Sequence, residues 1–204
     1  MEIVAENRRI PPARDNRKGE RIDSMSEADR IGRDRGLRAA VLSGDERAWQ
    51  TWYDENFSAL DRYILWRCGG LRDLADDALQ ETWLTAVRRV KKFAPERSTI
   101  GAWLRGIAAN VLRNQIRRKA LRRTRSLNSD LPDRDDGTAP DRGEHIARAL
   151  AALSERHEQV LQLKYLEGMA VEAIAHEWNE SAKAIESLLT RARAAFRAAY
   201  EKPE

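Results

Sequence analysis

The chain has 204 residues and a formal net charge of +4, and 34% of its residues are charged. This length suits one large domain or two small ones. The single cysteine, Cys68, permits no internal disulfide, and with the three histidines it forms no recognised zinc spacing. No apolar run approaches the roughly 20 residues of a membrane span, and the first residues lack the apolar core of a secretory signal. We therefore expect a soluble cytoplasmic protein with no membrane insertion and no metal or other cofactor.

Residues 1–34 mix basic and acidic side chains with few large apolar ones. Pro11, Pro12 and Gly19 would interrupt regular structure there. Because this segment offers little apolar surface for burial, we expect a disordered N-terminal arm.

Helical periodicity extends over residues 35–123. Asp45 is predicted to be an N-cap, with apolar residues recurring at helical spacing behind it. Gly69 and Gly70 predict the end of a helix, and the following helix should bury an apolar stripe that includes Leu79 and Val87. Nothing in this range alternates with period two for long, so we predict an all-helical domain.

Residues 124–143 differ from their surroundings, since they contain prolines, glycines and aspartates and almost no large apolar residue. We expect an acidic flexible linker there. Residues 144–204 return to helical patterning, with Ser154 as a predicted N-cap and two short helices separated by a tight turn. This outline is typical of a helix-turn-helix domain. The expected fold class is all-α, with two small helical domains joined by the linker.

An acidic face is the first candidate site. Its side chains recur at spacings of three and four, so they project from one side of a helix; they are Asp73, Asp76, Asp77, Gln80 and Glu81. A solvated helix face explains this pattern, and so does a docking surface for a basic partner. No histidine, second carboxylate cluster or glycine-rich phosphate loop accompanies them, so we do not expect an enzyme.

A basic run and an aromatic-bearing loop form the second candidate site. Seven basic residues and no acidic one lie between Arg113 and Arg125. Such a run favours an anionic partner such as nucleic acid, although a helix C-terminus also attracts two or three cations. Phe93 and Trp103 bracket Arg97, Ser98 and Thr99, which is the composition of a base-stacking platform, while core packing remains the alternative for both aromatics.

These segments resemble a known family. Asp73-Leu-Ala-Asp-Asp-Ala-Leu-Gln-Glu-Thr-Trp83, Phe93 to Pro95, and Ala102-Trp-Leu-Arg-Gly-Ile-Ala-Ala-Asn110 are similar to region 2 of the extracytoplasmic-function (ECF) group of bacterial sigma-70 factors. Leu153-Ser-Glu-Arg156, Tyr165-Leu-Glu-Gly168 and Arg191-Ala-Arg193 resemble region 4 of the same group. The resemblance covers about residues 37–123 and 144–200.

The resemblance implies a sigma factor that binds core RNA polymerase, recognises the −35 and −10 promoter elements and promotes DNA melting. The acidic face would dock on the polymerase, whose β and β′ subunits are the expected partners. The loop would capture a base flipped from the −10 element, and the following helix would contact the opening duplex. The implied −10 contacts are Phe93, Arg97, Ser98, Thr99, Trp103, Arg105, Asn110, Arg113, Asn114 and Arg117.

In region 4 the resemblance implies contacts with the −35 element. The implied residues are Ser181, Lys183, Ala184, Glu186, Ser187, Arg191 and Arg193. The chain departs from the family there, because Lys183 is the only cation before Arg191 and Glu186 stands where lysine is common. Glutamate near phosphates weakens binding, although it can accept a hydrogen bond from cytosine. The aspartates of the linker (Asp130, Asp133, Asp135 and Asp136) would thread the RNA-exit path of the polymerase.

An alternative function is a stand-alone helix-turn-helix regulator, which would bind an operator without polymerase and usually as a dimer. No leucine-rich dimerisation helix supports that alternative. The resemblance also allows an anti-sigma factor as a partner, and it implies a place at the bacterial nucleoid.

Overall fold

The computed structural model describes residues 26–127 and 142–202, with side chains from 26–119 and 142–202. All regular elements in these ranges are helices, which confirms the expected all-α class. The first unit contains α2 (Glu27–Leu42), α3 (Glu46–Arg67), α4 (Arg72–Arg89), the 3-10 turn η1 (Val90–Lys92) and α5 (Ile100–Leu127). The second contains α6 (Arg142–Ala152), α7 (Glu155–Leu161), the π-helical turn η2 (Gln162–Leu166), α8 (Val171–Glu177) and α9 (Ala182–Tyr200).

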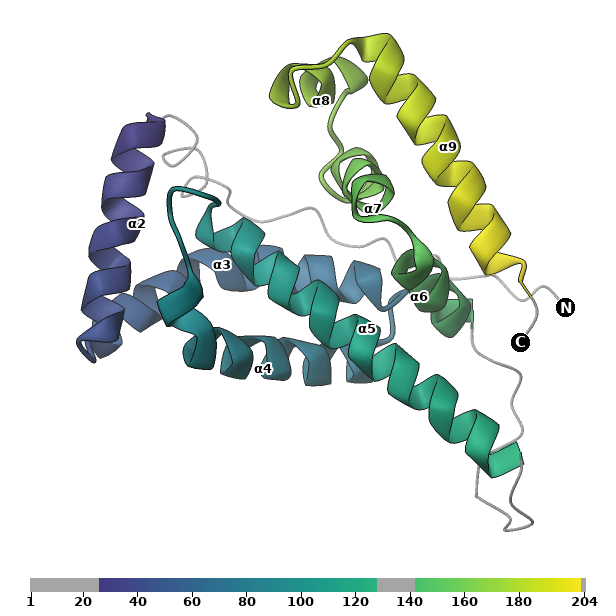
Figure 1. Cartoon of the computed structure of the whole chain (residues 1–204), viewed down its shortest axis with the longest axis horizontal. Coiled ribbons are helices and arrows are strands. Elements are labelled where there is room, and N and C mark those ends of the chain that lie inside the picture. Colours follow the sequence, from purple (N-terminus) through teal and green to yellow (C-terminus); the bar gives the residue numbers. More distant parts are fainter. Residues whose placement is uncertain (1–25, 128–141, 203–204) are drawn as a thin grey trace, which may run out of the picture.

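Helices α3, α4 and α5 enclose the main core of the first unit (Figure 1). The Asp45 carboxylate caps α3 by accepting a hydrogen bond from the Arg47 amide at 2.8 Å, as predicted. Gly69 and Gly70 follow the end of α3 with φ values of +64° and +89°, a conformation that glycine adopts without strain. Val87 is 51% exposed on α4, so the prediction that it belongs to the buried stripe is wrong.

Helix α2 corrects the expected boundary of the N-terminal arm. Residues 27–34 are helical, and the Ser26 hydroxyl caps the helix by accepting a hydrogen bond from the Asp29 amide. Leu37, Ala40 and Val41 then pack on a small aromatic core. This packing supplies the apolar burial that the charged sequence did not indicate, and residues 1–25 lie outside the described ranges.

The second unit is a helix-turn-helix domain with its own core. Side chains from α6, α7, α8 and α9 meet there, among them Leu150, Val160, Ile174 and Ile185. Ser154 caps α7 as predicted, and Ser181 caps α9. Helix α5 extends to Leu127 and α6 begins at Arg142, so both helices enter the stretch expected to be linker. The four linker aspartates lie outside the described residues.

The two units contact each other directly. Trp66 of α3 packs against both cores, and α6 lies against the first unit (Figure 1). Two glycines meet closely at this contact, because a Cβ atom on Gly69 would clash with the carbonyl oxygen of Gly143. A side chain at that position would force the units apart.

Candidate nucleic-acid interface

The predicted acidic face is formed by one helix. Asp73, Asp76, Asp77, Gln80 and Glu81 are all exposed on α4, while Ala75, Ala78 and Leu79 turn into the core. Asp76 pairs with Arg72 at 3.0 Å, and Glu81 accepts a hydrogen bond from Gln115 at 3.2 Å. No described residue of the second unit buries these side chains, so the face is available to a basic partner.

Two exposed apolar residues adjoin this acidic face and were not predicted. Leu84 and Val87 are 48% and 51% exposed. Leu84 follows Gln80 by four positions and Val87 follows Leu84 by three, so both extend the same side of α4. The sequence pattern did not indicate this exposure, since it assigned Val87 to the buried stripe.

The loop between η1 and α5 is anchored by buried residues and presents polar ones. Phe93 is 1% exposed, and its ring contacts Trp52 and Trp103 with centroid distances of 5.6 and 5.3 Å. The prediction that Phe93 stacks on DNA is therefore wrong, because a ring enclosed on both sides has no free face. Trp103 is half-buried in the same cluster.

The polar part of the loop lies at its exposed end. Arg97 and Thr99 are exposed and Ser98 is half-buried. The Thr99 hydroxyl accepts a hydrogen bond from the Ala102 amide at 3.1 Å, which caps the start of α5. These three side chains are the part of the loop that a base could reach.

Helix α5 carries the remaining predicted −10 residues. Asn110, Arg113, Asn114 and Arg117 are exposed, and Arg105 is half-buried. Asn110 accepts a hydrogen bond from Arg113 at 2.8 Å. Arg105, Asn110 and Arg113 line one cleft of about 370 Å³. The helix therefore brings amide and guanidinium groups to one surface, a set that suits phosphates and base edges.

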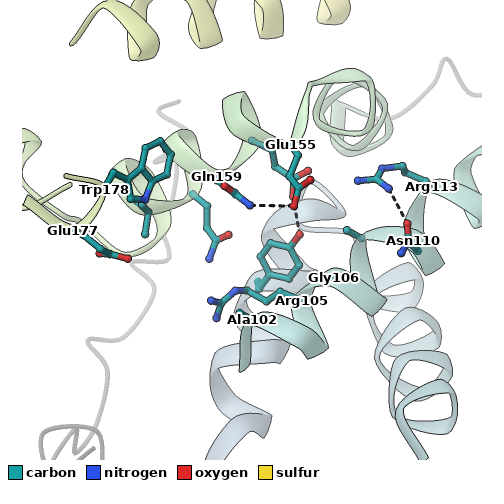
Figure 2. A pocket seen from close by; sticks show the side chains of 14 residues that line it. Ala102, Arg105, Gly106, Asn110, Arg113, Glu155, Gln159, Glu177 and Trp178 are labelled. Carbon is teal, nitrogen blue, oxygen red and sulfur yellow. Dashed lines mark hydrogen bonds between the residues drawn. The ribbon is translucent and has the colours of Figure 1, made fainter. Parts of the chain in front are cut away.

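The opposite wall of this cleft comes from the second unit. Glu155 and Gln159 of α7 and Glu177 and Trp178 around the end of α8 line it (Figure 2). Part of the candidate −10 surface thus faces carboxylates of the same chain. No sequence pattern indicated this arrangement, because the two walls come from separate units.

The structure divides the predicted −35 residues between two sides of the second unit. Ala184, Ser187 and Arg191 line one hollow with Ser154, Arg156 and His157. Arg156 and His157 are candidate residues that the sequence did not single out. Arg156 pairs with Glu180, and its guanidinium carbon lies 5.5 Å from the centre of the Trp178 ring.

Arg193 lies away from that hollow. Its Nε donates a hydrogen bond of 2.7 Å to the Tyr165 hydroxyl, and it lines a different, largely apolar groove. Arg191 and Arg193 are two positions apart on α9, which places their side chains on different faces. Lys183, Glu186 and Ser181 are exposed near the start of the helix.

Comparisons with known proteins match both units. The family model for sigma-70 region 2 matches residues 52–122, and the model for sigma-70 region 4 matches residues 144–196. The ECF RNA polymerase sigma factor SigL of Mycobacterium tuberculosis is 31% identical over 151 residues, which cover 71% of this chain and 84% of SigL. The chain belongs to the ECF sigma factors. Sigma factors bind core RNA polymerase and promoter DNA in transcription initiation, and they are generally non-enzymatic.

Two further relatives are similar to this ECF sigma factor. BldN of Streptomyces coelicolor is 26% identical over 157 residues, which cover 74% of this chain but only 59% of BldN. The structure of CnrH in complex with the cytosolic domain of CnrY is 27% identical, with 81% of this chain and 95% of CnrH covered and a TM-score of 0.45. Within residues 26–127 and 142–202, no helix is long and apolar enough to cross a membrane. The same residues contain no cluster of metal-ligating side chains.

Proposed function

We propose that this ECF sigma factor docks on core RNA polymerase through the acidic face of α4 and binds promoter DNA through three other surfaces. The loop residues Arg97, Ser98 and Thr99 take up a −10 base, and α5 binds the adjoining backbone. The start of α9 reads the −35 element. We further propose that it acts in the cytoplasm at the nucleoid, where promoter DNA lies, and that an anti-sigma factor is a partner.

The observation that carries this proposal is the separation of unlike charges onto different helices of one bundle. The exposed carboxylates of α4 and the exposed guanidinium and amide groups of α5 can engage a basic protein and an acidic nucleic acid at the same time. The acidic face of α4 attracts a basic protein and repels DNA, whereas the basic face of α5 attracts DNA and repels a basic protein.

Reconstitution with purified core polymerase tests the proposal. Promoter-specific run-off transcripts are expected with the full chain and not with core polymerase alone. Absence of any complex between the chain and core polymerase would contradict it. Tight operator binding by a dimer without polymerase would instead indicate a stand-alone regulator.

A further inference from the structure

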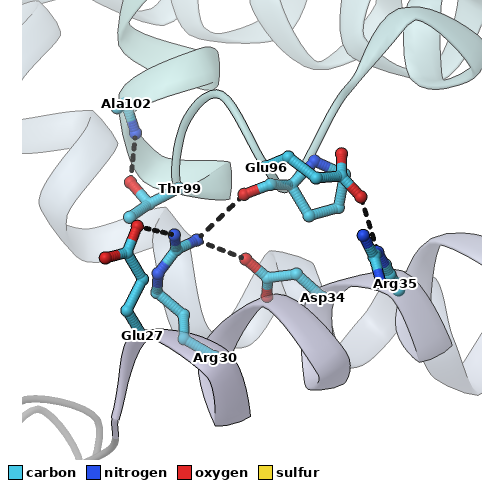
Figure 3. A network of polar contacts seen from close by, with 8 residues as sticks. Glu27, Arg30, Asp34, Arg35, Glu96, Thr99 and Ala102 are labelled. Atoms are coloured by element: carbon cyan, nitrogen blue, oxygen red, sulfur yellow. Dashed lines mark hydrogen bonds and ion pairs between the residues drawn. The ribbon is translucent and has the colours of Figure 1, made fainter.

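Helix α2 lies outside the matched region 2 segment, yet it contacts the candidate base-binding loop at two points and the preceding turn η1 at a third. Figure 3 shows Arg30 and Arg35 directed at this loop. Arg30 Nη1 donates a hydrogen bond to the Pro95 carbonyl at 3.4 Å. Arg35 Nε pairs with Glu96 Oε1 at 2.5 Å, and Arg38 Nη2 donates to the Lys91 carbonyl at 2.8 Å. Pro95 and Glu96 immediately precede Arg97, Ser98 and Thr99.

The arginine nearest the loop is held in place by its own helix. Arg30 pairs with Asp34 at 3.5 Å and with Glu27 at 3.8 Å. Burial raises the pKa of Asp34, while Arg30 and Arg33 oppose that shift by favouring its charged form. Arg33 also pairs with Glu55 of α3 at 2.5 Å, which ties α2 to the rest of the bundle. Arg30 therefore meets the loop from a fixed position.

Apolar packing adds to these polar contacts. Leu37 and Val41 of α2 lie against the cluster that holds Phe93 and Val90. Between Phe93 and α5 the backbone-to-backbone hydrogen bonds of the loop are of turn type, such as that from the Arg97 amide to the Ala94 carbonyl at 2.9 Å. Its shape thus depends on what packs beside it.

We propose that α2 fixes the conformation of the loop, and that Arg30 and Arg35 are positioning residues for recognition of the −10 base. They act through Pro95 and Glu96 and do not themselves touch DNA. This inference rests on the proposed role of the loop. A base-binding site must hold its side chains to within about 0.5 Å, so a loop released from α2 would distinguish bases less well.

The test compares transcription from a mapped promoter and from its variants with each other base at the captured −10 position. Arg30→Ala combined with Arg35→Ala should lower the preference for the best base about three- to tenfold, while binding to core polymerase stays unchanged. Arg30→Lys alone should retain most of the preference. Arg62→Ala, an exposed arginine on α3, is the matched control and should leave the preference intact.

A uniform loss of transcription at all four bases, with the preference unchanged, would overturn the positioning role. The failure of the proposed function looks different, because the unmodified chain would then show no preference at any −10 base. Thermal unfolding of each variant separates loss of fold from loss of positioning.

A different observation concerns the contact between the two units. Glu158 of α7 and Arg67 of α3 form an ion pair at 3.0 Å, and their side chains are 7% and 1% exposed. The Tyr63 hydroxyl donates to Glu158 at 2.6 Å, and Arg67 also donates to the Leu150 carbonyl at 3.0 Å. Burial raises the pKa of Tyr63, so its hydroxyl stays protonated as the donor.

This closed arrangement, defined by the Arg67–Glu158 pair, is incompatible with binding both promoter elements. The −10 and −35 elements are about 25 base pairs apart, or roughly 85 Å at 3.4 Å per base pair. In the closed arrangement, Glu155 and Glu177 also face Arg105 and Arg113 across the cleft, where DNA phosphates would otherwise bind. The units must therefore separate before the promoter is bound.

The buried pair is poorly satisfied, which favours an interface that can open. Nε and Nη2 of Arg67 are buried without a hydrogen-bond partner among the described residues. The attraction within a buried ion pair offsets the cost of desolvation fully only where the remaining donors are also hydrogen-bonded. We infer that the Arg67–Glu158 contact is an autoinhibitory one, which holds region 4 over the −10 surface of the free chain.

The inference is tested by resonance energy transfer between dyes on Ala59→Cys and Ala198→Cys, which are exposed on α3 and α9. The native Cys68 is buried and its pKa is raised to about 12, so it competes little for thiol reagents. Glu158→Ala should lower the transfer and strengthen binding of the free chain to single-stranded −10 DNA about fivefold. Glu172→Ala, an exposed carboxylate on α8, should change neither.

Unchanged transfer and unchanged DNA binding in a fully helical Glu158→Ala variant would overturn the autoinhibitory role. If that variant loses helical circular dichroism, Tyr63→Phe replaces it, because this change removes only the hydroxyl. Tyr63→Phe should also lower the energy transfer and strengthen binding to single-stranded −10 DNA, each by less than Glu158→Ala does. No shift in the folded Tyr63→Phe chain would count against the inference.

Discussion

At the scale of single residues, Phe93 is buried and anchors the loop that exposes Arg97 and Thr99. Its ring fills the space between Trp52 and Trp103, and Pro95 beside it is also buried. The exposed residues Arg97 and Thr99 extend from this anchored base. A base-binding loop can therefore be rigid at its ends and polar at its centre.

We predict that Phe93→Ala destabilises the protein by about 3–5 kcal/mol, the usual cost of removing a buried phenylalanine ring. Urea unfolding followed by circular dichroism measures the loss. Val87→Ala is the control, because a half-exposed side chain contributes little to stability. An unfolding midpoint that does not move in Phe93→Ala would show that the ring is not part of the core.

Asp77 offers a test of the acidic face at the same scale. Asp77→Asn should weaken binding to core polymerase by about fivefold, or about 1 kcal/mol, since one exposed charge contributes to the encounter and is screened by salt. The effect should shrink as salt is raised. Asp54→Asn, an exposed carboxylate on α3 outside the face, provides the comparison. Equal weakening by both changes would mean that net charge, rather than the α4 face, governs binding.

At the scale of elements, two arginines that are close in the sequence, Arg191 and Arg193, lie on different faces of α9. Arg191 belongs to the hollow beside α7, whereas Arg193 stacks on Tyr165, with the guanidinium carbon 5.8 Å from the ring centre. The two arginines therefore line different surfaces of the second unit. Arg193 therefore serves packing between α9 and η2 more directly than it serves recognition.

Salt titration of binding to −35 duplex DNA distinguishes these roles. Lys183→Ala and Arg191→Ala should each weaken binding and reduce the slope of log affinity against log salt by about 1, because each removes one phosphate contact. Arg193→Ala should leave the slope unchanged. If Arg193→Ala lowers the slope as much as Arg191→Ala does, the assignment of α9 faces is wrong.

The elements that the sequence predicted well are those fixed by local chemistry. Asp45 and Ser154 cap helices as their residue types indicated, and Gly69 ends α3. The first part of α2, residues 27–34, was missed because that part carries mostly charged residues, and the apolar residues that anchor the helix follow it and pack on α3 and on the cluster around Phe93. Likewise, nothing near Glu158 in the sequence indicates burial, since its partner Tyr63 is 95 positions away. Long-range pairs of this kind are set by tertiary packing alone.

At the scale of the whole molecule, the two candidate faces of the first unit differ in access. The acidic residues of α4 are exposed while the second unit is in contact, but part of the α5 surface faces α7 and the end of α8 across a cleft. Core polymerase can therefore reach the closed chain, whereas promoter DNA cannot fully do so. This difference implies an order, with polymerase bound first and DNA second.

The order has a measurable consequence for the dye pair on Ala59→Cys and Ala198→Cys. If polymerase binding precedes DNA binding and requires the units to separate, core polymerase added without DNA should lower the energy transfer, because the Arg67–Glu158 pair is then broken. Promoter DNA added without polymerase should change the transfer little. With Asp77→Asn, more polymerase should be needed for the same change, since the first contact is weakened. Transfer that stays high in the polymerase complex and falls only with DNA would mean that the promoter, rather than the polymerase, separates the units.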